Sequence, residues 1–500
     1  MNPGKIVRPN PPEHELRLGE NYYPADPETH FRYPNDKGSF ARAALRCVGV
    51  GKCRREEGGT MCPSYMVTRE EKHSTRGRAR LLWEMLEGQV IGKNGWRDEH
   101  VKEALDLCLA CKGCKSDCPV NVDMATYKAE FLSHYYDGRP RPIYAYAFGL
   151  INVWSRFAQI APSLVNFVNR APILSDLVKA MIGIAPQRRM PAYASESFKS
   201  WFVRRPVHNR GQARVLLWPD TFNNYFHPAT AKAAVAVLED AGFQVVIPHT
   251  DLCCGRPLYD YGMLKTAKRW LAQILMSLRD EIEAGTPIVG LEPSCTAVFR
   301  DELVEMFPEN ENARRLCEQT FTLAEFLQKK APDYHPPKLA RQALLHGHCH
   351  HKAVMKTACE EDLLKAIGVD FKKPDTGCCG MAGAFGFEAD KYDVSIACGE
   401  RLLLPEVRKA GKDTLIIADG FSCREQVRQT TDRVPLHIAE VLKMALDRGP
   451  RGPAGNFPEQ SYIQAEPGIP SKGKTLALLA CAALILGGIA GLVAGSKRRR

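Results

Sequence analysis

Four cysteines within eleven residues constrain this chain more than any other feature. They follow the spacing C-x2-C-x2-C-x3-C, directly before Pro119, and are Cys108, Cys111, Cys114 and Cys118. Three thiolates on one tight loop can hold three corners of an iron–sulfur cubane, while the fourth turns away toward a second cluster. A zinc ribbon would instead place a gap between two C-x2-C pairs. The spacing therefore predicts a site for two iron–sulfur clusters.

An earlier and less regular cysteine run is the expected partner of this loop. Cys47 and Cys53 are separated by five residues, with Val50 where a regular run has a cysteine, and Cys62 precedes Pro63. Crossed ligation would complete a [4Fe–4S] cluster from Cys62, Cys108, Cys111 and Cys114. The second cluster is left with three thiolates, so we expect a [3Fe–4S] cluster on Cys47, Cys53 and Cys118.

The C-x5-C spacing is similar to the trinuclear-cluster segment in the iron–sulfur subunit of succinate dehydrogenase. The chain departs from that pattern in the segment between Cys53 and Cys62, which has eight residues where the pattern has three. The departure leaves the geometry of the crossed fourth ligand open.

The cysteine count and the charge indicate the cellular compartment and the kinds of partner to expect. Eighteen cysteines occur in a chain whose first residues contain no apolar export segment, so we expect a reducing cytoplasm and metal ligands rather than disulfides. The formal net charge is +11, but six of the positive charges lie in residues 472–500. No basic stripe interleaved with aromatic residues is present, so nucleic acid is not an expected partner.

The chain divides into segments of different composition. A Pro-rich lead-in precedes the cysteine-rich region, a stretch with helical periodicity follows it, and strand-like runs then alternate with helical ones before a Pro/Gly linker. The connector carries charges and is therefore not transmembrane; we expect it to pack on the α/β part or a partner, with lipid contact less favoured. The expected divisions are 1–40, 41–138, 139–211, 212–330, 331–446, 447–474 and 475–495.

The α/β part carries an internal duplication. The triplet Cys-Cys-Gly occurs at 253–255 and again at 378–380, and each is followed by a strand and one further cysteine, Cys295 and Cys423. The two offsets are 125 and 128 residues, which indicates two related units. The expected fold is multidomain α+β, with a helical ferredoxin-like two-cluster domain, duplicated α/β CCG domains and one C-terminal apolar helix.

The two units offer unequal ligand sets. The second has four thiols, Cys349, Cys378, Cys379 and Cys423, which predict an iron–sulfur or zinc site. The first has three, Cys253, Cys254 and Cys295, and the sequence DTFNN at 220–224 stands where a fourth would be. Histidines flank Cys349, and we expect them in an outer shell: His346, His348, His350 and His351.

Long ordered motifs give the chain a family resemblance. CVGVGKCRREEGGTMCPSYM, CLACKGCKSDCP, LCCGRPLYD, HGHCHHKAV, DTGCCGMAGAFGFE and DGFSCREQV resemble the iron–sulfur half of FAD-linked dehydrogenases of D-lactate, glycolate or D-2-hydroxyglutarate. The CCG units are also similar to those of heterodisulfide reductases. The resemblance covers about residues 1–446. It implies an oxidoreductase component in which a flavoprotein oxidises the substrate and the CCG units lie toward the acceptor.

The flavin half is expected on another polypeptide. Residues 2–6 resemble the segment that closes the flavin domain in fused enzymes, and no G-x-G-x-x-G motif follows a strand. We therefore expect an FAD-binding dehydrogenase subunit as partner, unless that half has been lost. The catalytic residues and the substrate are not indicated.

The last segment predicts a membrane anchor. Residues 475–494 are apolar and uncharged over 20 residues, the length of one bilayer span, with lysines before them and KRRR after them. We expect a single-pass or tail-anchored protein of the cell membrane with its main domains on the cytoplasmic side. Gly487, Gly491 and Gly495 share one helix face, which favours a tail-mediated homodimer.

The function expected from the sequence is electron transfer from a flavoprotein, through iron–sulfur clusters, to a quinone or another membrane acceptor. Two alternatives stay open at this stage. One is a thiol–disulfide reductase of the heterodisulfide type, acting at the CCG cysteines. The other is a non-catalytic metal-binding membrane anchor.

Overall fold

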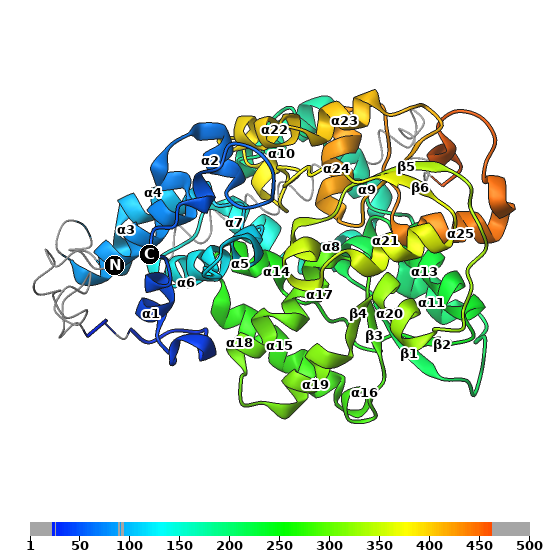
Figure 1. Ribbon diagram of the computed structural model, residues 1–500, viewed down its shortest axis with the longest axis horizontal. Coiled ribbons are helices and arrows are strands. Elements are labelled where there is room, and N and C mark those ends of the chain that lie inside the picture. The colour runs from blue at the N-terminus through cyan, green and yellow to red at the C-terminus, as the bar shows by residue number, and fades with distance from the viewer. Residues whose placement is uncertain (1–22, 26, 89–90, 92–94, 463–500) are drawn as a thin grey trace, which may run out of the picture.

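The computed structural model describes residues 23–25, 27–88, 91 and 95–462. A helical region that contains the first seven cysteines lies at one end of the elongated molecule, and two α/β units form the other (Figure 1). The predicted apolar helix at 475–495 lies outside the described residues. Among those described, no helix is long and apolar enough to cross a bilayer.

The N-terminal region is built from short helices around the cysteine loops. Asp98 caps α4, where its carboxylate accepts hydrogen bonds from two amides of the first turn, and Ser74 caps α3 in a similar way. The helices are α1 (Phe40–Leu45), α2 (Pro63–Thr68), α3 (Thr75–Glu87), α4 (Glu99–Asp106), α5 (Gly113–Asp117) and α6 (Met124–Tyr135).

The connector forms five helices, as its periodicity predicts. Prolines stand at the first turns of α9 and α10, where a missing N–H costs nothing. The helices are α7 (Ile143–Gly149), α8 (Ile151–Ala158), α9 (Pro162–Arg170), α10 (Pro172–Ile182) and α11 (Phe198–Arg204).

The first α/β unit contains a four-stranded parallel sheet of order β2-β1-β3-β4. Its strands are β1 (Arg214–Trp218), β2 (Gln244–Val246), β3 (Ile288–Gly290) and β4 (Thr320–Thr322). Its helices are α12 (Thr221–Tyr225), α13 (Pro228–Asp240), α14 (Arg256–Asp260), α15 (Leu264–Ser277), α16 (Arg279–Glu283), α17 (Pro293–Arg300), α18 (Glu302–Met306), α19 (Glu311–Gln319) and α20 (Leu323–Lys330).

The second unit has a three-stranded parallel sheet of order β6-β5-β7. Its strands are β5 (Gln342–Leu345), β6 (Asp370–Lys372) and β7 (Leu415–Ile417). Its helical segments are a π-helical turn, η5 (His351–Met355), and α21 (Ala358–Ala366), α22 (Tyr392–Glu400), α23 (Leu403–Lys409), α24 (Phe421–Thr430) and α25 (Ile438–Arg448).

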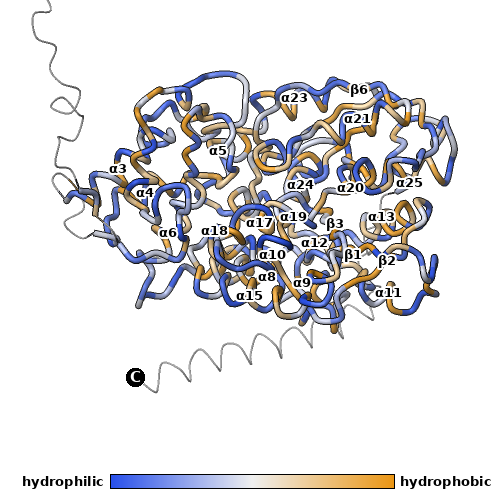
Figure 2. The backbone as a smooth tube through the Cα atoms, turned by 60° about the horizontal axis from the view of Figure 1, so that its bottom comes forward, coloured by the Kyte–Doolittle hydropathy of each residue, from blue (hydrophilic) through white to orange (hydrophobic). Residues whose placement is uncertain are grey.

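The strand pairing confirms the duplication. A central strand, β1 or β5, lies between a strand that precedes a Cys-Cys-Gly triplet and a strand that precedes a lone cysteine. The carboxyl ends of parallel strands meet at one edge of a sheet, so each unit gathers its cysteines there. The units pack on each other through α13 and α25, and their strands share one hydrophobic core. Hydrophobic stretches of the chain run through this strand region, and hydrophilic ones are common in the outer loops (Figure 2).

Candidate metal centres

The loop that carries the regular cysteine run is held by unusual backbone conformations. Ala110 and Lys112 have positive φ values of 48° and 55°, which turn the chain tightly between α4 and α5. Three of its cysteines are buried, and Cys118 is partly exposed. The loop therefore directs its first three thiols inward, as the spacing predicts.

Gly113 brings the two cysteine runs together. A Cβ atom at this position would lie only 2.9 Å from the Thr60 carbonyl carbon, so a larger residue would push the Cys62 segment away. Asp117 fixes the same segment by accepting hydrogen bonds from the Thr60 and Met61 amides, at 2.8 and 3.0 Å. The close neighbours of Gly113 are therefore Thr60 and Met61, directly before Cys62.

The cysteines receive backbone hydrogen bonds of the kind that stabilise thiolates. Thr75 N donates to Cys62 Sγ at 2.9 Å, Arg76 N to Cys53 Sγ at 3.3 Å, and Met124 N to Cys114 Sγ at 3.3 Å. A hydrogen bond from the Cys62 thiol, opposed by burial, lowers the pKa of Cys53 to about 6. Free, closely spaced thiols with amide donors fit iron–sulfur ligation.

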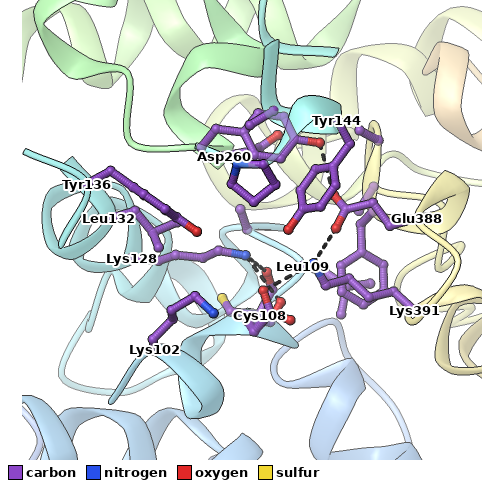
Figure 3. A pocket seen from close by; sticks show the side chains of 18 residues that line it. Lys102, Cys108, Leu109, Lys128, Leu132, Tyr136, Tyr144, Asp260, Glu388 and Lys391 are labelled. Carbon is purple, nitrogen blue, oxygen red and sulfur yellow. Dashed lines mark hydrogen bonds and ion pairs between the residues drawn. The ribbon is translucent and has the colours of Figure 1, made fainter. Parts of the chain in front are cut away.

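A small polar cavity of about 40 Å³ lies beside Cys108 (Figure 3). The Lys128 ammonium donates to the Cys108 carbonyl at 2.7 Å, and Lys391 of the second unit lies 3.1 Å from Asp106. These two cations come from different domains and converge next to one expected ligand. Asp106 and Glu388 both pair with Lys391, so much of this positive charge is compensated locally.

A buried ion network lies on the other side of the same loop. The Lys112 side chain is fully buried, and its ammonium lies 3.1 Å from Asp123, 2.5 Å from Asp301 and 3.1 Å from Glu302. Burial alone would raise the pKa of Asp123, but Lys112 and Lys115 hold it well below its usual range. The network joins the cysteine loop to α17 and α18 of the first unit.

The first unit gathers its three predicted cysteines, and no fourth joins them among the described residues. Cys254 Sγ donates to Cys295 Sγ at 2.9 Å, while Cys253 Sγ lies 3.7 Å from the Thr221 hydroxyl. Although the Cys254 hydrogen bond lowers the pKa of Cys295, burial raises it to about 12. Neutral thiols with a hydroxyl in the fourth place suit this unit poorly for a four-thiolate metal site.

The second unit gathers all four of its predicted cysteines. Cys378 lies within hydrogen-bonding reach of both Cys349 and Cys379, and Cys379 also contacts Cys423. Hydrogen bonds from the neighbouring thiols hold the pKa of Cys379 well below its usual range, although burial opposes them. Four soft ligands, one of them favoured as a thiolate, fit an iron–sulfur or zinc site.

His346 is closer to this site than sequence reasoning expected. Its ring, with Cys379 and Cys423, offers three ligand atoms that lie within 4.8 Å of one another. The Thr376 hydroxyl lies 2.6 Å from His346 Nδ1, which orients the ring. His348, Cys349 and His350 form a second such group. In the sequence, only the position of these histidines directly after the buried strand β5 could have indicated their place at the site.

The two metal-binding regions meet directly. Cys111, Cys349 and Cys378 belong to one buried cluster, together with Leu109 and Cys398. Cys398 also donates to the carbonyl of Pro63 at 3.6 Å, and α2 packs on α22. No spacing in the sequence indicated this contact, because its members are more than two hundred residues apart.

Comparison with known proteins agrees with this geometry. Residues 43–122 match a family model described as a 4Fe-4S dicluster domain. Residues 220–300 and 343–428 each match a cysteine-rich domain family, CCG. The chain contains a dicluster domain and two CCG domains. The iron–sulfur and CCG predictions are thereby confirmed, whereas the [3Fe–4S] assignment stays a prediction.

Several known proteins are similar to this chain over more than half of its length. A D-2-hydroxyglutarate dehydrogenase of Pseudomonas putida is 26% identical over 494 residues, which cover 88% of this chain and 47% of the relative. The glycolate oxidase iron-sulfur subunit of Escherichia coli is 24% identical, with 83% of this chain and 97% of the subunit covered. One subunit of the anaerobic glycerol-3-phosphate dehydrogenase of Escherichia coli is 27% identical over 290 residues, covering 57% of this chain and 72% of that subunit. The chain spans about half the length of the D-2-hydroxyglutarate dehydrogenases that it matches.

Proposed function

We propose that the chain is the electron-transfer component of an FAD-linked 2-hydroxyacid dehydrogenase, and that it passes electrons from a flavoprotein to a quinone or another membrane acceptor. Its relatives are dehydrogenases, an oxidase subunit and a dehydrogenase subunit, which are all oxidoreductase components. Two relatives that are covered almost completely are named iron–sulfur subunits, which supports a separate flavoprotein partner.

The observation that carries this proposal is that the dicluster cysteines lie between a partly exposed surface and the second CCG domain. Cys47 and Cys118 are partly exposed, whereas Cys108, Cys111 and Cys114 are buried, and Cys111 is in turn clustered with Cys349 of the second CCG domain. Iron–sulfur clusters held by these sets would supply one-electron transfer. The dicluster cysteines thus reach both the partly exposed surface, at Cys47 and Cys118, and the second CCG domain, at Cys111.

The surface near Cys47 is suited to a protein donor. A groove lined by Cys47, Gly49 and Arg76 opens there, and Val48 and Val50 in the adjoining loop are 65% and 59% exposed. Apolar side chains over a partly exposed ligand favour close approach of a partner. We propose this face as the side from which electrons enter.

We further propose that the protein works at the cell membrane with these domains on the cytoplasmic side. The apolar sequence at 475–495 supports this location, and its aligned glycines support pairing of tails. Zinc or a further iron–sulfur group at Cys349, Cys378, Cys379 and Cys423 remains part of the proposal.

The test is an anaerobic mixture of the cluster-loaded chain with the flavoprotein of a 2-hydroxyacid dehydrogenase. When D-2-hydroxyglutarate, D-lactate or glycolate is added, the visible iron–sulfur absorption of the chain should bleach. The bleaching should occur on the time scale of flavoprotein turnover. The chain alone should neither bleach nor oxidise any of the three acids. Bleaching without flavoprotein, or no bleaching with any reduced flavoprotein, would contradict the proposal. Metal analysis that finds zinc in every cysteine site would also contradict the proposal of electron transfer.

A further inference from the structure

A large cavity lies between the connector and the two CCG domains. Its volume is about 470 Å³, and its lining is mainly apolar, with side chains from α7, α8 and the segment 382–387. The helices α7, α8 and α14 that border it are neighbours in the fold (Figure 1). Volumes of about 300–1,000 Å³ are usual for small-molecule sites that are mostly apolar with a few polar groups.

The cavity ends at the second metal-binding region. Cys349, His348 and His350 line it, and so does Leu109 of the dicluster loop, which packs with Cys349 in one buried cluster. A ligand in this cavity would therefore contact residues next to both the Cys108 loop and the four-cysteine site. This position links the cavity to electron transfer rather than to a distant surface function.

One polar atom in this wall has no hydrogen-bond partner among the described residues. It is Nε2 of His350, a residue that is only 6% exposed. The His350 ring is stacked on that of His348, with centroids 5.3 Å apart. A buried ring nitrogen without a partner costs free energy, which a hydrogen-bonding ligand would recover. The hydroxyl-bearing Ser294 lines the same cavity and offers a second polar contact.

Another part of the cavity lining is aromatic. The rings of Phe222 and Phe421, one from each CCG domain, are stacked with centroids 4.3 Å apart and planes inclined by 17°. Both line the cavity, as do Phe148 and Trp154 of the connector. Such a wall favours a planar ring system.

The rim of the cavity is apolar and exposed. Ile143, Tyr146 and Trp154 line it and are 60%, 39% and 46% exposed. Eight of the fourteen large hydrophobic side chains exposed in the described structure lie between residues 143 and 181. Exposed apolar side chains at the mouth of a cavity favour a ligand that arrives from an apolar phase.

We propose that this cavity binds a lipid-soluble quinone, with the ring near His350 and the aromatic wall and the tail leaving between α7 and α8. Quinones combine a planar ring, two carbonyl acceptors and an apolar tail, which match the aromatic wall, the buried polar atoms and the exposed rim. The inference rests on the proposed function, because it names the class of acceptor that receives the electrons.

The first measurement is the affinity of the full-length, cluster-loaded chain for decylubiquinone under anaerobic conditions. Ala147 of α7 lines the cavity, so Ala147→Phe should fill it and weaken binding about tenfold or more. Ala272, a half-buried alanine of α15, does not line the cavity, and Ala272→Phe should leave the affinity unchanged. Equal affinity in both variants would overturn the inference.

The second measurement needs no substitution. An azido-quinone illuminated on the unmodified chain should label peptides from 143–158 and 382–387, and excess decylubiquinone should suppress the label. Labelling confined to other peptides, or no saturable binding, would overturn the inference. Bleaching by reduced flavoprotein in the absence of quinone tests the proposed function separately, so failure of one is distinguishable from failure of the other. Displacement of the label by a polar organic disulfide, but not by decylubiquinone, would favour a disulfide-binding site instead.

Discussion

The ammonium of Lys112 lies 2.5 Å from the carboxylate of Asp301, which is 189 residues further along the chain. The pair joins the dicluster loop to the first CCG domain, and it is buried on both sides. Because Lys112 stands between Cys111 and Cys114, the contact that holds two domains together also positions the ligand loop.

Lys112→Met is therefore expected to destabilise the protein strongly. Removing the cation takes from Asp123, Asp301 and Glu302 the one partner that all three share and leaves Lys115 and Arg256 to compensate them, so we expect the lower end of the usual range, about 3 kcal/mol in the free energy of unfolding. Thermal unfolding followed by circular dichroism under anaerobic conditions measures the loss. The control is Lys443→Met, which removes an exposed pair with Asp447 and should cost less than about 1 kcal/mol. Similar melting temperatures for both variants would show that the network contributes little.

Metal binding at the second CCG domain should depend on Cys379. Cys379→Ser removes the thiol that contacts both Cys378 and Cys423, so we expect loss of the metal of that site while the iron of the dicluster domain is retained. Cys359→Ser is the matched control, because Cys359 is half-buried outside the site. Iron and zinc analysis of both proteins, normalised to protein concentration, gives the result. Unchanged metal content in Cys379→Ser would exclude this cysteine as a ligand.

The cysteine sites could be predicted from local spacing because their chemistry requires short loops. The run at 108–118, the two triplets and the lone cysteines after β3 and β7 all lie where parallel strands or tight turns collect them. The sequence also predicts that the two CCG domains differ as metal sites, because one has three thiols and the other four. In the structure, the Thr221 hydroxyl lies near Cys253 where the fourth sulfur is missing.

The contacts between domains could not be predicted in this way. Nothing local to Lys112 indicates that its partner is Asp301, and nothing near Cys111 points to Cys349. Such pairs depend on how complete domains pack, which is a long-range property. The position of His346 relative to Cys379 likewise depends on the register of β5 and β6, which residue types alone do not determine.

Val50 is expected to decide the type of the second cluster. With Cys47, Cys53 and Cys118 as its only thiolates, that site should hold three irons, and the whole dicluster domain about seven. Val50→Cys should add about one iron and abolish the paramagnetic signal of an oxidised trinuclear centre. The Val50 side chain is 59% exposed, so a cysteine here must turn inward to ligate.

Iron analysis and electron paramagnetic resonance of the air-oxidised protein make the comparison, with Val48→Cys in the same loop as the control. Val48 is similarly exposed, at 65%, but lies outside the C-x2-C-x2-C register. Two four-iron clusters in the unmodified protein would require a ligand other than cysteine at the second site.

The sequence favours packing of the connector on protein over contact with lipid, but its exposed apolar side chains predict that this face binds lipid. Phe157 and Ile160 are 63% and 82% exposed, and Phe157→Glu with Ile160→Glu should weaken co-sedimentation with phospholipid vesicles several-fold. Met276 is an isolated exposed residue of α15 at 72%, so Met276→Glu should have no effect. Both comparisons are made in the full chain and in a chain that ends at residue 474, so that the contribution of the tail is separated. Vesicle binding that depends on the tail alone would exclude the connector as a membrane surface.

The stability of the protein should fall as the pH rises through the titration of Glu292. Burial raises the pKa of this carboxyl to about 7, and the nearby Asp220 adds to the effect. In the unfolded chain the value is near 4.5, so between these limits the folded state holds a proton that the unfolded state has released. The contribution of Glu292 to the free energy of unfolding is therefore fully present below pH 4.5 and is lost as the pH rises through 7. The loss amounts to about 3 kcal/mol.

Glu292→Gln imitates the protonated carboxyl and keeps an oxygen that can accept the hydrogen bond from the Phe421 amide, which measures 2.8 Å in the structure. Melting temperatures at pH 5.5 and pH 8 should therefore differ less in this variant than in the unmodified protein. Glu311→Gln, at an exposed pair with Arg315, is the control and should leave the pH dependence unchanged. The hydrogen bond from the Phe421 amide joins Glu292 of the first CCG domain to the start of α24 in the second. If Glu292→Gln and Glu311→Gln show the same pH dependence, the Glu292 carboxyl does not titrate at this contact.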